Sequence, residues 1–302
     1  MARGKRKKEK YITYDYEAAY TAQFEKINEI FAETILANRK KMVYALKEVK
    51  AGNQLEVEIY PQFARVTDLP PGITPKKDNK KAQRNLNDKN ARKYVERLIN
   101  ENFNENDIWA TFTYDDEHLP PDGDIDRSMK NMQNWIKKVN RKRKQKGLKN
   151  ARYIYVTEYS PYDEIRWHHH IVIDGELPMD ELEAMWTHGS RNQVRRLDKD
   201  ENGLSGMANY IVKEKDRLKH EKRWNSSKGL KKPKEKTVHS KKDKGGKYKR
   251  IEYYAEKMVA DWESVREYME MWYPQYTFTR SEIRYNEFNC QFYIATRMRK
   301  LE

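Results

Sequence analysis

The most informative part of the chain is the stretch Tyr155-Val-Thr-Glu-Tyr-Ser-Pro-Tyr-Asp-Glu-Ile-Arg-Trp-His-His-His-Ile-Val-Ile-Asp174. It contains two runs with β character, residues 153–158 and 167–173, and a polar segment between them. Two such runs joined by a short polar segment are typical of a β-hairpin. We therefore expect these residues to form two neighbouring antiparallel strands.

Three of the seven histidines of the chain follow one another in the second run. Because side chains alternate along a strand, His168 and His170 are predicted on one face and His169 on the other, with Ile171 and Ile173. Two imidazoles on one face can share a metal ion, and neutral imidazole suits Mn, Fe, Co, Ni or Zn. Glu158 on the paired strand can supply a carboxylate as a third ligand. The alternative is a polar strand face that merely carries surface histidines.

Sequence patterns on both sides of the hairpin predict a mixed α+β domain. The expected order is a strand at 108–114, a helix from about 126 to 144, the hairpin, a helix at 179–186, a strand at 193–197 and a helix at 204–217. The order β, α, β, β, α, β is that of ferredoxin-like domains, in which an antiparallel sheet carries helices on its faces. The helix 204–217 would then lie across the sheet face that carries His168 and His170.

Tyr210 and Lys213 are a second candidate pair, because residues three apart on a helix are neighbours on its surface. A phenol has a pKa near 10 and is a poor nucleophile at neutral pH unless its phenolate is favoured. A lysine ammonium and a divalent metal both favour the phenolate, and both stabilise negative charge on a phosphate. The alternative is ordinary helix packing, since the chain contains 21 tyrosines.

Taken together, three motifs in this order resemble the HUH endonuclease superfamily, specifically rolling-circle replication initiators (Rep proteins) with one catalytic tyrosine. The first motif is Thr111-Phe-Thr-Tyr-Asp-Asp-Glu-His-Leu-Pro120, the second runs from Glu158-Tyr159 to His170, and the third is Asn209-Tyr-Ile-Val-Lys213. The resemblance covers residues 108–215. The position between the two histidines is usually apolar in that superfamily, whereas here it is His169. The third motif has one tyrosine, which argues against the two-tyrosine mechanism of some phage relatives.

The resemblance implies a role for each of these residues. His168, His170 and Glu158 would bind Mg²⁺ or Mn²⁺, Tyr210 would be the nucleophile, and Lys213 would position the phosphate or balance the metal site. The implied reaction nicks and rejoins single-stranded DNA at a replication origin through a 5′-phosphotyrosine. Two alternatives stay open: a transposase or mobilisation relaxase of the same superfamily, and a non-catalytic DNA-binding protein.

The charge distribution also points to a nucleic acid partner. The formal net charge is +15, of which residues 3–10 contribute +5 and residues 215–250 contribute +12, so the remainder carries 15 − 17 = −2. Concentrated positive charge of this kind favours a polyanion. We expect residues 219–250 to form a flexible basic loop that contacts phosphates, which would give affinity without sequence information.

The expected organisation has five parts. Residues 1–10 are a basic arm, 11–85 a helical accessory region, 86–218 the HUH catalytic domain, 219–250 the basic flexible segment and 251–302 an α/β accessory element. Within the accessory regions we expect a helix from Tyr14 to about Lys50, a strand at 55–59, a helix capped by Asn87 or Asp88, a helix at 255–271 and short strands at 276–279 and 292–294.

A single cysteine, Cys290, excludes an internal disulfide and fits a reducing compartment. No apolar run reaches the roughly 20 residues that cross a bilayer, so we expect no membrane partner and a cytoplasmic location in a bacterial host. The sequence lacks the Gly-x-x-x-x-Gly-Lys-Ser/Thr pattern of a P-loop, so unwinding is expected to need a host helicase, and synthesis a host polymerase.

Overall fold

The structure is a computed structural model that describes residues 42–63, 80–160, 165–200, 202–204, 206, 224–286 and 291–301. The chain forms two compact units. Among the described residues, the first unit comprises 92–200, 204 and later residues up to 231, and the second comprises the residues up to 91, 202–203 and those from 232 onward. The predicted five-part organisation stays a prediction.

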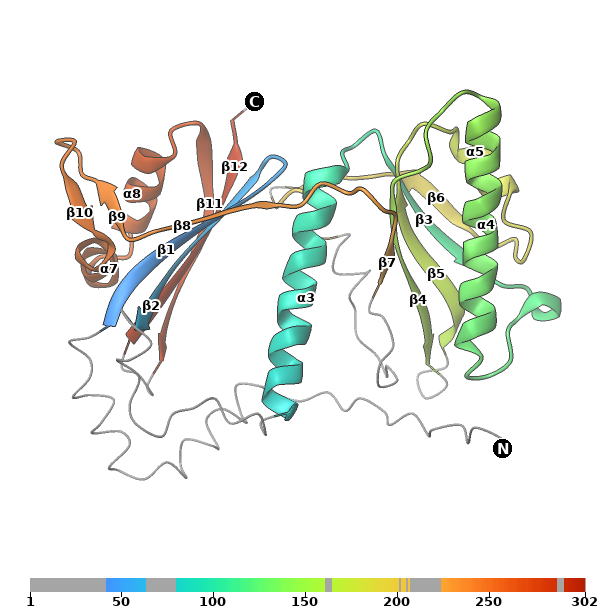
Figure 1. The fold of residues 1–302 in the computed structure, drawn as a ribbon, viewed down its shortest axis with the longest axis horizontal. Coiled ribbons are helices and arrows are strands. Elements are labelled where there is room, and N and C mark those ends of the chain that lie inside the picture. Colours follow the sequence, from blue (N-terminus) through green and yellow to red (C-terminus); the bar gives the residue numbers. More distant parts are fainter. Residues whose placement is uncertain are drawn as a thin grey trace. The chain divides into compact units, whose positions relative to one another are not determined.

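The first unit is built on a five-stranded antiparallel sheet with the order β6-β3-β5-β4-β7 (Figure 1). Its strands are β3 (Ile108–Thr113), β4 (Tyr153–Ser160), β5 (Ile165–Ile173), β6 (Gln193–Arg196) and β7 (Asn225–Ser226). Its helices are α3 (Lys80–Asn102, from Arg92 onward), η3 (Asp116–His118), α4 (Ile125–Gln145) and α5 (Met179–Ala184). The order β3, α4, β4, β5, α5, β6 confirms the predicted α+β fold class, and β4 and β5 are neighbours as expected.

Apolar side chains cover both faces of this sheet. Helices α4 and α5 pack on one face, where a cluster of buried residues includes Phe112, Trp135, Ile171 and Leu182. The end of α3 packs on the other face, where Ile99 contacts a cluster that includes Ile154 and Val172. Because even-numbered and odd-numbered residues of β5 face opposite sides, His168 and His170 share the α3 face with Val172.

Helix α4 shows why these residues form a helix at this place. Asp124 caps its first turn by accepting a hydrogen bond from the Arg127 backbone N–H at 3.1 Å. Met132, Trp135 and Val139 recur at helical spacing and are buried against the sheet. The helix therefore confirms the predicted segment 126–144 almost to the residue.

The second unit contains a separate five-stranded sheet with the order β11-β12-β2-β1-β8, and a two-stranded hairpin of β9 and β10 (Figure 1). Its strands are β1 (Met42–Ala51), β2 (Gln54–Phe63), β8 (Lys234–Val238), β9 (Ser240–Lys242), β10 (Tyr248–Arg250), β11 (Tyr276–Asn286) and β12 (Gln291–Lys300). Helices α7 (Ile251–Ala260) and α8 (Ser264–Trp272) bury Tyr254, Met258 and Met269 against this sheet.

The helix predicted from Tyr14 to about Lys50 is wrong over residues 42–50, which form strand β1. Strand β1 pairs with β2 along its whole length, from Met42 opposite Phe63 to Ala51 opposite Gln54. Gly52 does not stop a helix but lies in the two-residue turn of this hairpin, with φ of 57°. Gly-Asn is a preferred sequence for such a turn. The helical spacing on which the prediction rested lies upstream of residue 42, outside the described residues.

The segment 219–250 is not a continuous loop in its described part, since it contains β7, β8, β9 and β10. Strand β8 pairs with β1, with Val238 opposite Leu46. Four of the five residues of β8 are exposed, because this strand forms an edge of the sheet. Charged side chains are common on edge strands, where they discourage further pairing. They also hide the alternation by which strands are recognised.

Three further boundaries differ from the predictions. Helix α3 begins at Lys80 and not after Asn87 or Asp88, since the residues from 80 onward include good helix formers. The helix predicted at 255–271 is two helices, separated where Asp261 adopts extended backbone. The C-terminal strands are longer than expected and join β2 through β12. Most of the predicted helix 204–217 lies outside the described residues.

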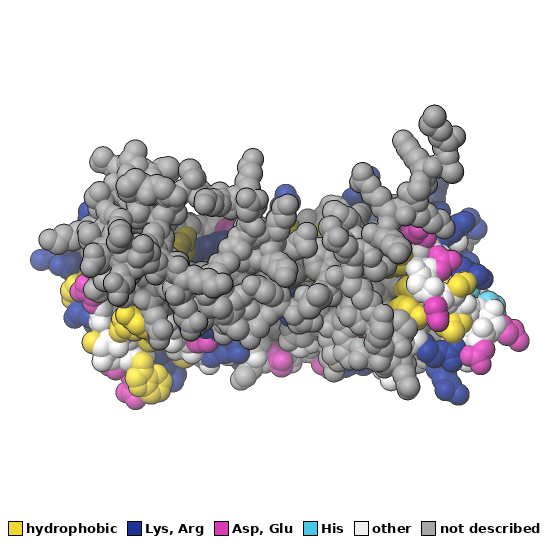
Figure 2. Space-filling model, turned by 90° about the horizontal axis from the view of Figure 1, so that it is seen from below, with side chains coloured by type: hydrophobic (Ala, Val, Ile, Leu, Met, Phe, Trp, Pro, Cys, Tyr) yellow, Lys and Arg dark blue, Asp and Glu magenta, His cyan; other side chains and the backbone are white. Residues whose placement is uncertain are grey.

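On the surface shown in Figure 2, the Lys and Arg side chains of the described residues lie among Asp and Glu side chains and form no large patch on that face. This mixture agrees with the near-zero charge outside the two basic blocks. Within the described ranges, no helix has the length and apolar character that a membrane-crossing helix needs.

Candidate metal centre

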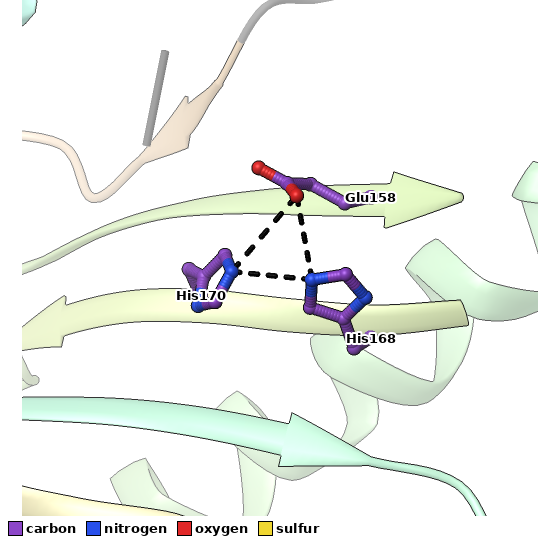
Figure 3. A group of neighbouring side chains, drawn as sticks. All are labelled: Glu158, His168 and His170. Carbon is purple, nitrogen blue, oxygen red and sulfur yellow. Dashed lines mark hydrogen bonds and ion pairs between the residues drawn. The ribbon is translucent and has the colours of Figure 1, made fainter. Parts of the chain in front are cut away.

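Strands β4 and β5 bring Glu158 and the two histidines together. In their antiparallel register Glu158 lies opposite His168, and Val156 lies opposite His170. A residue directly opposite on the neighbouring strand projects from the same face of the sheet. Glu158 therefore projects toward the histidines from the next strand, as Figure 3 shows.

The donor atoms of this group lie within metal-binding reach of one another. Nε2 of His168 is 3.3 Å and Nε2 of His170 is 3.9 Å from Oε2 of Glu158, and the two Nε2 atoms are 3.2 Å apart (Figure 3). All three donor atoms lie within 4.8 Å of one another, so the group can hold a metal ion. The side chains of Glu158, His168 and His170 are 20%, 18% and 12% exposed, so solvent reaches the group only partly.

Hydrogen bonds on the far side of each ring orient the histidines. Nδ1 of His168 is 2.9 Å from the carbonyl oxygen of Arg166 and, because a carbonyl only accepts, Nδ1 carries the proton. In the neutral ring the lone pair is then on Nε2, facing Glu158. Nδ1 of His170 is 3.0 Å from Oγ1 of Thr111. Metal-binding histidines commonly use their second nitrogen in this way.

The chemistry of the group fits a cation. Two imidazole Nε2 atoms and a carboxylate oxygen converge, and such electron-rich atoms at these distances repel unless a proton or cation lies among them. Among the described residues, the second oxygen of Glu158, Oε1, is buried and has no hydrogen-bond partner. Buried polar atoms normally have a partner, so this oxygen is available to a bound ion.

The pKa of His168 reflects these neighbours. Burial by itself would lower the pKa of His168, but the hydrogen bond to Glu158, the bond to the Arg166 carbonyl and the negative charge of Glu158 together raise it. A proton can therefore take the place of a cation on Nε2. Metal binding would have to displace this proton, so affinity should rise with pH.

His169 lies on the opposite face, as alternation predicts. It is fully buried, with Nε2 2.9 Å from the Tyr114 hydroxyl and Nδ1 2.9 Å from Thr157 Oγ1. Burial, together with the neighbouring histidines, lowers the pKa of His169 to about 3. The ring is therefore neutral at physiological pH and holds β5 against α4 and β4.

Trp109 and Thr111 complete the surroundings of His170, and the sequence patterns assigned them no role. The Trp109 indole N–H donates to Thr111 Oγ1 at 3.2 Å, and the Trp109 ring stacks on the His170 ring with centroids 5.2 Å apart. Strand β3 places Thr111 directly opposite His170. The signal that could have found them is this register between the first two motifs.

Tyr210 and Lys213 lie outside the described residues. The chain is described on either side of them, at Leu204 and again from Trp224. These two flanking residues belong to the apolar cluster on the α3 face of the sheet, where Leu204 is buried and Trp224 is partly buried. This is the face from which His168 and His170 project.

Residues 107–215 match a model of a family of replication-associated proteins, described as the ORF2 and gene-2-protein type. The matched segment includes strands β3 to β6, the metal-binding group and the Tyr210 motif. The similarity supports a role in DNA replication for this part of the chain. No curated protein and no solved structure shows a significant match to the chain.

Proposed function

We propose that this protein initiates rolling-circle DNA replication by nicking and rejoining single-stranded DNA at an origin. The proposal rests chiefly on one observation. A Glu/His/His group that can hold a metal ion lies on two neighbouring strands inside the segment similar to replication-associated proteins. A three-ligand group of this kind leaves coordination positions for a substrate phosphate.

In the proposed site, His168, His170 and Glu158 hold a divalent ion, Mg²⁺ or Mn²⁺. Such an ion supplies Lewis-acid polarisation of a phosphoryl oxygen. The chain itself fixes the ligands: the Arg166 carbonyl holds the His168 ring, and Thr111 and Trp109 hold the His170 ring. Positions fixed before substrate arrives lower the cost of ordering the reacting groups.

Tyr210 is the proposed nucleophile. Its phenolate oxygen forms a bond to the scissile phosphorus, and the bond from phosphorus to the 3′-oxygen breaks. The 3′-oxygen leaves with the electron pair and takes up a proton, which gives a free 3′-hydroxyl and a 5′-phosphotyrosine. The reverse reaction rejoins the ends without a nucleotide cofactor, because the ester bond is kept in the covalent intermediate. The 3′-hydroxyl would prime a host polymerase while a host helicase unwinds the duplex.

Lys213 is proposed to favour the Tyr210 phenolate or to bind the phosphate. The helical spacing in the sequence supports this role, and so do the packing positions of the flanking residues Leu204 and Trp224 on the histidine face. An ammonium near the phenol lowers the free energy of the phenolate, and an ammonium near the phosphate stabilises the charge that builds there.

The decisive experiment incubates the full chain with a labelled single-stranded origin oligonucleotide and Mg²⁺ or Mn²⁺, and measures the covalent protein–DNA adduct on a denaturing gel. Tyr210→Phe should abolish the adduct, whereas the control Tyr94→Phe, at an exposed tyrosine of α3, should form it normally. Adduct formation by Tyr210→Phe at the wild-type level would overturn the assignment of the nucleophile.

The same assay separates the two alternatives. A non-catalytic DNA-binding protein would form no adduct on any DNA with any ion. A transposase or relaxase would form a Tyr210 adduct on a transposon end or a transfer origin, but not on a replication origin.

A further inference from the structure

The hairpin formed by β9 and β10 in the second unit concentrates positive charge on a short ribbon. Residues 240–250 contain six Lys or Arg residues and one acidic residue, Asp243. Asp243 serves the turn: its carboxylate accepts a hydrogen bond from the Lys247 backbone N–H at 2.9 Å, and its carbonyl accepts one from the Gly246 backbone N–H at 2.9 Å. The acid therefore shapes the turn and does not pair with a lysine side chain.

Most of these cations have no carboxylate partner in the described part of the chain. Lys241 is the exception, because it contacts the buried Glu48 at 2.7 Å. Lys244 lies 3.6 Å from Glu267, but both side chains are exposed, so this pair contributes little. No carboxylate of a described residue lies within ion-pair distance of the other four, which are Lys242, Lys247, Lys249 and Arg250. Their mutual repulsion would be relieved by an external polyanion.

A cleft of about 490 Å³ lies beside this hairpin, and its lining combines lysines with aromatic rings. Tyr248 and Lys242 line it from directly opposite positions of the hairpin, with the Lys242 ammonium 5.4 Å from the centre of the Tyr248 ring. Trp272 lines it from α8, and its indole N–H is satisfied by the Lys242 carbonyl at 3.1 Å. The Tyr248 side chain is 69% exposed, so its ring is open to a stacking partner.

We propose that this cleft binds single-stranded nucleic acid, with phosphates on the hairpin cations and an unpaired base stacked on Tyr248. Base stacking on aromatic side chains together with a basic groove is the usual means of binding single strands without sequence preference. Duplex DNA hides its base faces, so Tyr248 would add little to duplex binding. An anionic membrane is disfavoured because residues 240–250 contain no aliphatic apolar residue for insertion.

This inference goes beyond the proposed function, because it concerns a different unit of the chain and uses neither Tyr210 nor the metal-binding group. If it is right, the second unit would keep hold of a single strand independently of cleavage. If the origin-nicking proposal fails, binding at this cleft can still be measured.

The test is the affinity of the full chain for a labelled oligothymidylate, measured by fluorescence anisotropy without divalent metal. Tyr248→Ala should weaken binding about tenfold, the usual effect of losing one stacked base. Trp262→Ala is the matched control, because Trp262 lies in the same unit and is also 69% exposed. An equal loss in both variants, or none in Tyr248→Ala, would overturn the stacking on Tyr248.

Charge is tested separately through the salt dependence. The triple variant Lys242→Gln/Lys247→Gln/Lys249→Gln should lower the slope of log Kd against log salt by roughly 2, because each phosphate contact to a single strand contributes about 0.7. The control Lys130→Gln/Lys137→Gln/Lys144→Gln removes the same charge from exposed positions of α4. Equal slopes in the two triple variants would show an effect of net charge alone and would overturn the proposal. So would an equal loss for duplex and single-stranded DNA in Tyr248→Ala.

Discussion

The Nε2 atoms of His168 and His170 face each other at 3.2 Å. Two neutral rings that both present lone pairs at this distance repel, and the Glu158 carboxylate adds further negative charge. A cation or a proton must therefore be part of the folded state. This pairing of like atoms distinguishes the group from histidines that merely share an exposed strand face.

Removing either ring should abolish metal binding. His168→Ala and His170→Ala should each weaken Mn²⁺ affinity by more than the roughly 10–100-fold that the loss of an outer-shell partner costs. Isothermal titration calorimetry on the full chain measures this directly. His188→Ala is the control, since His188 lies outside the Glu158 group. Unchanged affinity in both cluster variants would refute the site.

Thr111 should matter for metal binding although it is not a proposed ligand. Its Oγ1 can accept both the Trp109 indole N–H and a proton from Nδ1 of His170, which leaves the lone pair of that ring on Nε2. Thr111→Val should lower metal affinity by roughly 10–100-fold, and Thr111→Ser should retain it.

The control for this prediction lies two residues further along the same strand. Thr113 projects from the same face, but its hydroxyl donates to the Arg191 carbonyl at 2.8 Å. Thr113→Val should therefore leave metal affinity unchanged. Equal losses in Thr111→Val and Thr113→Val would indicate a general effect on β3 and not the orientation of His170.

His169 should contribute to stability and not to metal binding. Its two ring nitrogens contact the hydroxyls of Tyr114 and Thr157 in a fully buried position. His169→Leu leaves both hydroxyls without this partner, which should cost about 1–3 kcal/mol for each unsatisfied group. Urea denaturation measures this loss. Metal affinity of the folded variant should stay within about twofold of wild type, by the outer-shell argument.

Acid should selectively weaken the wild-type fold through the same residue. The pKa of His169 is about 3 when folded and near 6.5 when unfolded, so between these values only the unfolded state binds the proton. The stabilising contribution is complete above pH 6.5, decreases as the pH falls below it, and stops decreasing near pH 3. From about pH 6.5 to about pH 5 the loss should be on the order of 2 kcal/mol. With metal chelated, His169→Leu should lack this part of the pH dependence, and an identical dependence would contradict the assignment.

In the second unit, Glu48 should depend on Lys241. The buried Glu48 carboxylate accepts hydrogen bonds from Lys241 at 2.7 Å and from the Tyr273 hydroxyl at 2.8 Å. Burial alone would raise the pKa of Glu48, but these bonds and the charges of Lys241 and Lys236 lower it. Lys241→Met should destabilise the unit by about 3–5 kcal/mol, because an unpaired charge stays buried.

The double variant Glu48→Gln/Lys241→Met tests the reason for that loss. It removes both charges, so it should be clearly more stable than Lys241→Met in urea denaturation. Because the folded pKa of Glu48 is lowered, its contribution in the wild type is present above the unfolded value near 4.5 and is lost as the pH falls below it. A double variant no more stable than the single one would show that lost packing, and not the buried charge, is responsible.

Local patterns in the sequence were sufficient for the sheet of the first unit and for half of the candidate site. Alternation along residues 167–173 predicts correctly that His168 and His170 share one face and His169 takes the other. The helix of residues 125–145 and the order of strands and helices were also predicted, because each depends on periodicity within one segment. The roles of Tyr210 and Lys213 stay predictions, drawn from the resemblance and from their spacing.

The remaining features depend on contacts between distant segments, which local patterns do not contain. Strand β1 is a strand because β2 and β8 pair with both of its edges, although β8 lies far away in the sequence. The basic residues of β9 and β10 become a ribbon only because two short strands pair around the Asp243 turn. Thr111 contacts His170 because β3 lies beside β5, and this register follows from how the whole sheet packs. Periodicity specifies which face a side chain takes, whereas the neighbour across that face is chosen by the free energy of the assembled sheet.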